Sequence, residues 1–191
     1  MKPTKHSPVL ALVALCLFAG TASAHTGAHT ATGFVSGLAH PLLGLDHLLA
    51  MIAVGLWAAQ QGGRARWAVP AAFVGAMGLG GGLAGLGWGL PHAETVIALS
   101  VLVLGVLVAT RRQWAVAAGM AITAGFALFH GYAHGLEMPQ AASPVGYALG
   151  FVLATVCLHG AGVAGSLVGR HAMRAAGIGI AATGLALIFS V

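Results

Sequence analysis

The chain has 191 residues, of which 59% are apolar and only 6% are charged, and its formal net charge is +5. A soluble domain normally carries about 25% charged residues, so this composition excludes a soluble globular protein and indicates an integral membrane protein. The basic residues are scattered in pairs and form no stripe, so we expect no nucleic-acid partner.

The first residues have the pattern of an export signal. Two lysines precede a short apolar run, and the small residues Ala22 and Ala24 match a signal-peptidase cleavage site. We therefore expect a signal peptide over residues 1–24 and a mature chain, residues 25–191, that forms a single transmembrane domain. An uncleaved signal anchor is the alternative, and it would leave the orientation of the remaining chain unchanged.

Six apolar stretches follow this signal, and a helix needs about 20 such residues to cross the hydrocarbon core of a bilayer. They cover residues 33–59, 67–87, 94–110, 114–134, 145–168 and 172–190. The expected fold class is therefore all-α, a polytopic membrane protein with six transmembrane helices after a cleavable signal peptide. Many of the 30 glycines lie four residues apart, as in Gly33/Gly37 and Gly78/Gly82, and this spacing lets helices approach closely in lipid.

Every arginine of the chain falls in or beside an alternate loop between these stretches. Cytoplasmic loops carry the excess of arginine and lysine in membrane proteins, so these loops are expected to be cytoplasmic. The arginines are Arg64, Arg66, Arg111, Arg112, Arg170 and Arg174. The pattern predicts a multi-pass protein of the cell inner (cytoplasmic) membrane whose mature N-terminus and C-terminus are periplasmic, in agreement with the export signal.

The segment H-P-L-L-G-L-D-H, residues 40–47, places three ionisable side chains inside the first apolar stretch. Each such group costs about 2.5–3.5 kcal/mol at membrane depth, so it usually lines a pathway or binding site. A residue before proline avoids helical angles, so the span is expected to begin or kink at His40, with Pro41 in its first turn. In a continuous helix His40 and His47 would share a face, whereas Asp46 would point about 100° away from His47. Asp46 is then either a direct metal ligand or a group that orients an imidazole.

A second polar segment, F-H-G-Y-A-H-G-L-E at residues 129–137, lies at the end of the fourth apolar stretch. His130, His134 and Glu137 are spaced by four and three residues, which places them on one face of a helix. Both segments are expected at a similar depth on the same side of the membrane, so we predict a shared site for a divalent metal. Imidazole suits nickel, zinc, copper and iron alike. The alternative is that these groups only join helices by hydrogen bonds.

Five further residues are candidates for a secondary metal site or a relay. His159 lies in the middle of the fifth stretch and is either a ligand or relay, or a buried imidazole bonded to a backbone carbonyl. His92 and Glu94 lie at the mouth of the third stretch, where they either attract cations or are simply solvated. His25 and His29 follow the predicted cleavage site and either chelate a metal or belong to a disordered tail.

The H-P-x-x-G-x-D-H segment followed by Met51, together with the F-H-G-x-A-H-G-x-E segment, resembles the two signature motifs of the HupE/UreJ family of bacterial nickel transport proteins. These proteins accompany hydrogenase and urease systems, and the resemblance extends over the whole chain. It implies a nickel permease that supplies nickel-enzyme maturation proteins, with cobalt as an alternative cargo. The functional residues that it implies are His40, Asp46, His47, His130, His134 and Glu137.

The only lysines, Lys2 and Lys5, lie in the signal, so the mature chain has no phosphate-binding loop and cannot itself use nucleotide. We expect passive transport of Ni²⁺ as substrate, no tightly bound cofactor and no enzymatic activity. Three alternatives stay open: a membrane-embedded zinc hydrolase, a haem-binding electron carrier, and a sensor or accessory protein that binds metal without moving it. The sequence does not distinguish a monomer from a homo-oligomer.

Overall fold

The computed structural model describes residues 33–139 and 142–191. These residues form seven α-helices and one short 3₁₀ helix, without a strand among them. The predicted signal peptide, residues 1–24, lies outside this range, as do His25 and His29. The elements are α2 (Gly33–Leu43), α3 (Leu45–Gln61), α4 (Ala65–Gly85), α5 (Ala93–Thr110), α6 (Val116–Glu137), α7 (Pro144–Gly165), η1 (Ser166–Val168) and α8 (Arg170–Ile188).

The helices confirm the predicted class of a multi-pass membrane protein. The helices α4, α5, α6 and α8, and α7 extended through η1, are each long and apolar enough to cross a membrane. The pair α2 and α3 passes the same test together but is bent by 83° at its break, so it is either one broken span or a re-entrant segment. The predicted stretches therefore correspond to five spans, or six if the bent pair is counted.

The break in the first predicted span does not lie where the sequence indicated. Pro41 belongs to the last turn of α2 rather than to the first turn of a new helix. The break falls instead at Gly44, whose backbone is extended (φ −92°, ψ 119°), and α3 begins at the next residue. Asp46 in the first turn of α3 favours this start, because a carboxylate stabilises the positive end of a helix. His40 and His47 consequently lie on different helices.

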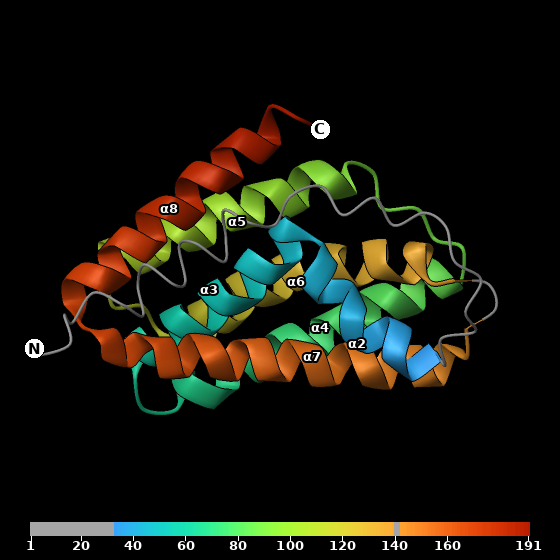
Figure 1. The fold of residues 1–191 in the computed structure, drawn as a ribbon, viewed down its shortest axis with the longest axis horizontal. Coiled ribbons are helices and arrows are strands. Elements are labelled where there is room, and N and C mark those ends of the chain that lie inside the picture. Colours follow the sequence, from blue (N-terminus) through green and yellow to red (C-terminus); the bar gives the residue numbers. More distant parts are fainter. Residues whose placement is uncertain (1–32, 140–141) are drawn as a thin grey trace, which may run out of the picture. The chain divides into compact units, whose positions relative to one another are not determined.

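The helices pack in a few extensive pairs. α4 packs mainly against α6, and α5 against α8, while α7 packs against both α2 and α3. Figure 1 shows α8 running alongside α5 and α2 lying against α7. α3 also contacts α5 and α4, so α3 lies among several helices rather than at the edge.

Glycines permit the closest of these approaches. A Cβ atom at Gly80 of α4 or at Gly131 of α6 would overlap a backbone carbonyl of the facing helix, and the same holds for Gly37 between α2 and α7. The pair Gly78/Gly82, which has the expected spacing, does not pack in this way: no heavy atom of the described residues lies within 4 Å of an added Cβ. The spacing alone therefore does not identify which glycines pack.

The arginine-bearing loops gather at one end of the helices. The side chain of Gln61 at the end of α3 donates to the carbonyl of Arg112 (3.0 Å) and accepts from the backbone N–H of Trp114 (2.8 Å). This joins the α3–α4 turn to the α5–α6 loop. A surface hollow is lined jointly by the end of α5 and the start of α8, with Arg111, Arg112, Arg170 and Arg174. The three loops thus share one side, as the arginine pattern predicts.

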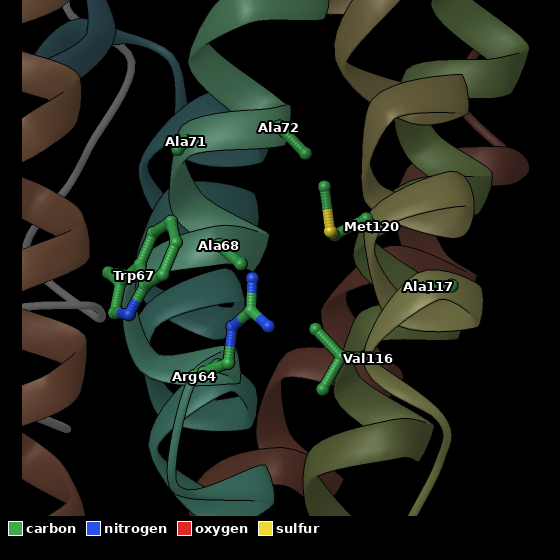
Figure 2. A pocket seen from close by; sticks show the side chains of 8 residues that line it. All are labelled: Arg64, Trp67, Ala68, Ala71, Ala72, Val116, Ala117 and Met120. Atoms are coloured by element: carbon green, nitrogen blue, oxygen red, sulfur yellow. The ribbon is translucent and has the colours of Figure 1, made fainter.

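A pocket of about 570 Å³ lies at this arginine end, between α4 and the start of α6 (Figure 2). The guanidinium carbon of Arg64 is 5.8 Å from the centroid of the Trp67 ring beside it. The remaining lining consists of alanine, valine and methionine side chains. The described lining has neither a histidine nor a carboxylate, so this pocket offers no imidazole or carboxylate ligand to a divalent cation.

Candidate metal site

The histidines of the two sequence motifs converge at the opposite end, where α3 begins and α6 ends. Ligand atoms of His47, His130 and His134 lie within 4.8 Å of one another; we call these residues the inner group. Ligand atoms of His40, His134 and Glu137 meet the same limit and form the outer group. His134 belongs to both groups, so they are adjacent.

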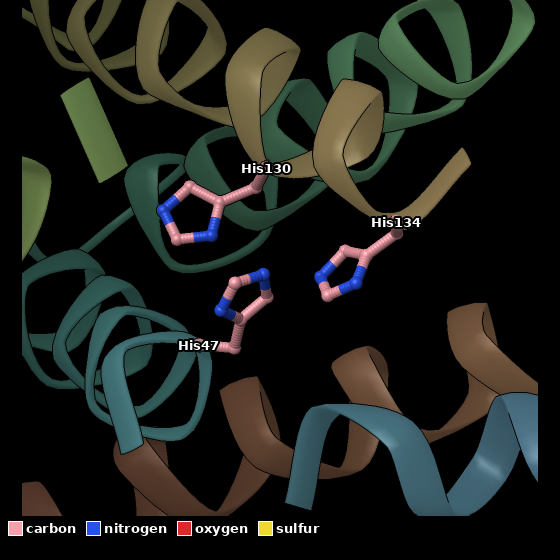
Figure 3. A group of neighbouring side chains, drawn as sticks. All are labelled: His47, His130 and His134. Atoms are coloured by element: carbon pink, nitrogen blue, oxygen red, sulfur yellow. The ribbon is translucent and has the colours of Figure 1, made fainter. Parts of the chain in front are cut away.

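The inner group is buried between α3 and α6. The ring centroid of His47 is 4.9 Å from that of His130 and 4.0 Å from that of His134. All three side chains are almost inaccessible to solvent. Figure 3 shows one nitrogen of each ring turned toward the space between the three residues. The four-residue spacing of the two α6 histidines, one helical turn, lets both face the single histidine of α3.

Asp46 fixes the orientation of His47. Its Oδ1 lies 2.6 Å from Nδ1 of His47 and 2.7 Å from the backbone N–H of the same residue. An ionised carboxylate only accepts hydrogen bonds, so Nδ1 carries the ring proton and Nε2 keeps its lone pair. Asp46 itself belongs to neither group. This geometry agrees with the orienting role rather than with direct ligation.

Ser100 of α5 does the same for His130, from outside both motifs. Its hydroxyl lies 2.6 Å from the carbonyl oxygen of Ile97 and 2.8 Å from Nε2 of His130. A carbonyl can only accept, so the single hydroxyl proton is used there and the hydroxyl oxygen must accept from Nε2–H. His130 therefore keeps its lone pair on Nδ1. A serine in an otherwise strongly apolar stretch is the sequence signal that could have identified this residue.

Several ring nitrogens in the inner group have no hydrogen-bond partner among the described residues. They are Nε2 of His47, Nδ1 of His130 and both nitrogens of His134, and all are buried. Leaving buried polar atoms without a partner is costly. Since two of these nitrogens are held as lone-pair donors by Asp46 and Ser100, the arrangement suits a borderline divalent cation, for which imidazole is a common ligand.

The outer group is more open to solvent. Nε2 of His40 lies 2.9 Å from Oε2 of Glu137, and Nδ1 of His134 lies 3.8 Å from the same oxygen. The side chains of His40 and Glu137 are 27% and 51% exposed, compared with 5% for His134. The bend at Gly44 is what carries His40 away from α3 and toward the end of α6.

The remaining candidates in the described residues belong to neither group. His159 is buried, its ring centroid is 5.1 Å from that of Phe73, and neither of its nitrogens has a partner in the described part of the chain. It therefore lacks the backbone hydrogen bond that the alternative interpretation required. His92 precedes α5 in a left-handed conformation (φ 60°), and both His92 and Glu94 are exposed. Neither is part of the two groups.

Comparison with known proteins agrees with these observations. A family model described as HupE / UreJ protein matches residues 13–187. The chain is 44% identical to Protein HupE of Rhizobium leguminosarum bv. viciae over 190 aligned positions, which cover 96% of this chain and 98% of that protein. No solved structure matches the chain. The extent of both sequence matches shows that this chain belongs to the HupE/UreJ family.

Proposed function

We propose that the protein is a nickel permease of the cytoplasmic membrane that carries Ni²⁺ inward through the inner and outer groups. The observation that carries the proposal is the inner group: three buried imidazoles from two helices, whose facing nitrogens have no hydrogen-bond partner among residues 33–139 and 142–191. The family membership favours nickel, with cobalt as a second cargo. The ion would supply the maturation of hydrogenase or urease.

The charges near the site support a divalent cation as substrate. The chain has only three acidic residues, and two of them, Asp46 and Glu137, are bonded to histidines of the groups. A charge at membrane depth is costly unless a partner offsets it. Two carboxylates beside neutral imidazoles offset the two positive charges of the ion, while the imidazoles replace part of its hydration shell.

The arginine end supports inward transport, because loops rich in arginine face the cytoplasm in membrane proteins. In this orientation the two histidine groups lie toward the periplasm, and the ion enters there. A divalent ion moving inward gains about 4.6 kcal/mol per 100 mV of inside-negative potential, twice the value for one charge. No nucleotide is then required. His159, buried and without a hydrogen-bond partner in the described part of the chain, would act as a relay toward the cytoplasm.

The test is uptake of radioactive nickel into proteoliposomes that contain the full chain, with an inside-negative potential imposed. We expect potential-driven accumulation by the wild type, and its loss in Asp46→Asn and His47→Ala. The matched control is His171→Ala, since His171 lies at the exposed start of α8, and it should transport normally. Cobalt is tested as a competitor in the same assay.

Tight nickel binding without any uptake by the wild type would contradict the permease. That outcome would favour an accessory protein that holds the metal, or a membrane-embedded zinc hydrolase. The two are separated by whether the zinc-loaded protein cleaves lipid or peptide bonds.

A further inference from the structure

We infer that the pathway holds the ion at two successive positions, an outer one at His40 and Glu137 and an inner one at His47 and His130, and that His134 is the ligand shared by both. This inference rests on the proposed function and specifies how the site works. Its basis is that each group alone brings three ligand atoms within 4.8 Å of one another, with His134 as the common member.

The two nitrogens of His134 face different groups. Nδ1 lies 3.8 Å from Oε2 of Glu137, in the outer group. Figure 3 shows one nitrogen of the ring turned toward His47 and His130 and the other turned away from them. The ring centroid of His134 is 4.8 Å from that of His40 and 4.0 Å from that of His47. One imidazole therefore stands between the two positions and presents a nitrogen to each.

Solvent access orders the two positions. Glu137 and His40 are partly exposed, at 51% and 27%, whereas the side chains of His47 and His134 are 8% and 5% exposed. His130 is fully buried. A hydrated ion can reach the outer group while it keeps some of its water. It must exchange that water for imidazole nitrogens to reach the inner group, so the outer position precedes the inner one.

The shared ring also limits occupancy. A neutral imidazole has one lone pair, on the nitrogen that carries no proton. His134 can therefore bind an ion in the outer group or in the inner group, but not in both at once. The two positions are filled in turn, and the chain holds one ion at saturation. Weak, successive binding positions are also what allows an ion to leave as well as enter.

The test is equilibrium binding of Ni²⁺ alone to the purified full-length protein, without transport. The variants are Glu137→Gln for the outer group, His130→Gln for the inner group and His134→Gln for both, with His171→Gln as the matched control. We expect each single-group variant to bind one ion with a Kd within about tenfold of the wild-type value, because the other group stays complete. Removing a group that only orients a metal ligand already costs about 10–100-fold in metal affinity. His134→Gln removes a ligand from both groups, so its metal affinity should fall by more than about a hundredfold.

X-ray absorption of the bound nickel gives a second readout that needs only the two single-group variants. His130→Gln should show a carboxylate oxygen and two imidazoles, because the ion rests in the outer group. Glu137→Gln should show three imidazoles and no carboxylate. Equal loss of affinity in all three variants, or the same ligand set in both single-group variants, would overturn the two-position arrangement.

The outcomes separate this inference from the proposed function. Wild-type uptake together with equal loss in the three variants would keep the permease and replace the two positions by one joint site. The predicted binding pattern without uptake in proteoliposomes would keep the two positions and reject transport.

Discussion

The hydroxyl oxygen of Ser100 on α5 lies 2.8 Å from Nε2 of His130 on α6 and accepts its hydrogen bond. The serine proton is already donated to the carbonyl of Ile97, so the direction of this bond is fixed. A residue on a third helix thus determines which nitrogen of His130 faces His47. In the inner group, Ser100 orients His130 in this way and Asp46 orients His47.

In a Glu137→Gln background, where only the inner group can bind the ion, Ser100→Ala should weaken nickel binding by about 10–100-fold, the usual cost of removing a group that orients a metal ligand. Without the serine, His130 is free to place its proton on Nδ1 and to withdraw its lone pair from the site. The matched control is Ser166→Ala in the same background, because Ser166 likewise donates to the carbonyl three residues earlier (2.7 Å) but bonds no imidazole of the described residues. Titration of the purified variants with Ni²⁺ is the measurement. Equal affinity of both variants would show that Ser100 has no part in the site.

Gly131→Ala should lower the stability of the helix bundle and displace both α6 histidines. A Cβ at this position would overlap the carbonyl of Met77, and overpacking of this kind costs about 1–3 kcal/mol. Gly125→Ala on the same helix is the control, since no atom of the described residues outside its own helical surroundings lies within 4 Å of its added Cβ. Thermal unfolding in detergent should show a lower midpoint for Gly131→Ala and an unchanged or higher one for Gly125→Ala. Equal midpoints would contradict the close α4–α6 packing.

His159→Gln should leave the nickel Kd within about threefold of the wild-type value but slow uptake by about tenfold, which corresponds to about 1.4 kcal/mol on one transport step. The reason is position: His159 is buried against Phe73 and lies outside both groups. Binding is measured on the purified variant, and uptake in the proteoliposomes described above. Normal uptake by His159→Gln would show that the buried imidazole is not a relay.

The arginine end should be cytoplasmic, and single cysteines can test this in intact cells. Gln113→Cys in the α5–α6 loop and Ser190→Cys near the C-terminus both place a thiol at an exposed position, in a background where Cys16 and Cys157 are replaced by serine. A membrane-impermeant thiol reagent should label the cysteine at position 190 and leave the one at position 113 unlabelled until the cells are opened. The reverse pattern would invert the predicted topology and the direction of entry.

The sequence predicted the fold class well, because the fold class of a helical membrane protein depends on local composition. Apolar length and alternate arginines do not require knowledge of helix packing, and the observed helices begin and end within a few residues of the predicted stretches. The spacing of four and three likewise placed His130, His134 and Glu137 on one face, because helical periodicity is a local property.

The tertiary structure decided how residues far apart in the chain combine. Pro41 indicated a break, yet the backbone turns at Gly44, and this shift separates His40 from His47 and brings His40 to Glu137, 97 residues away. Ser100 carries no motif, and its role appears only where α5 meets α6. The sequence by itself determined which polar side chains belong to the apolar helices. The packing of helices, which no single segment encodes, determined which of these side chains meet and how His134 comes to stand between two groups.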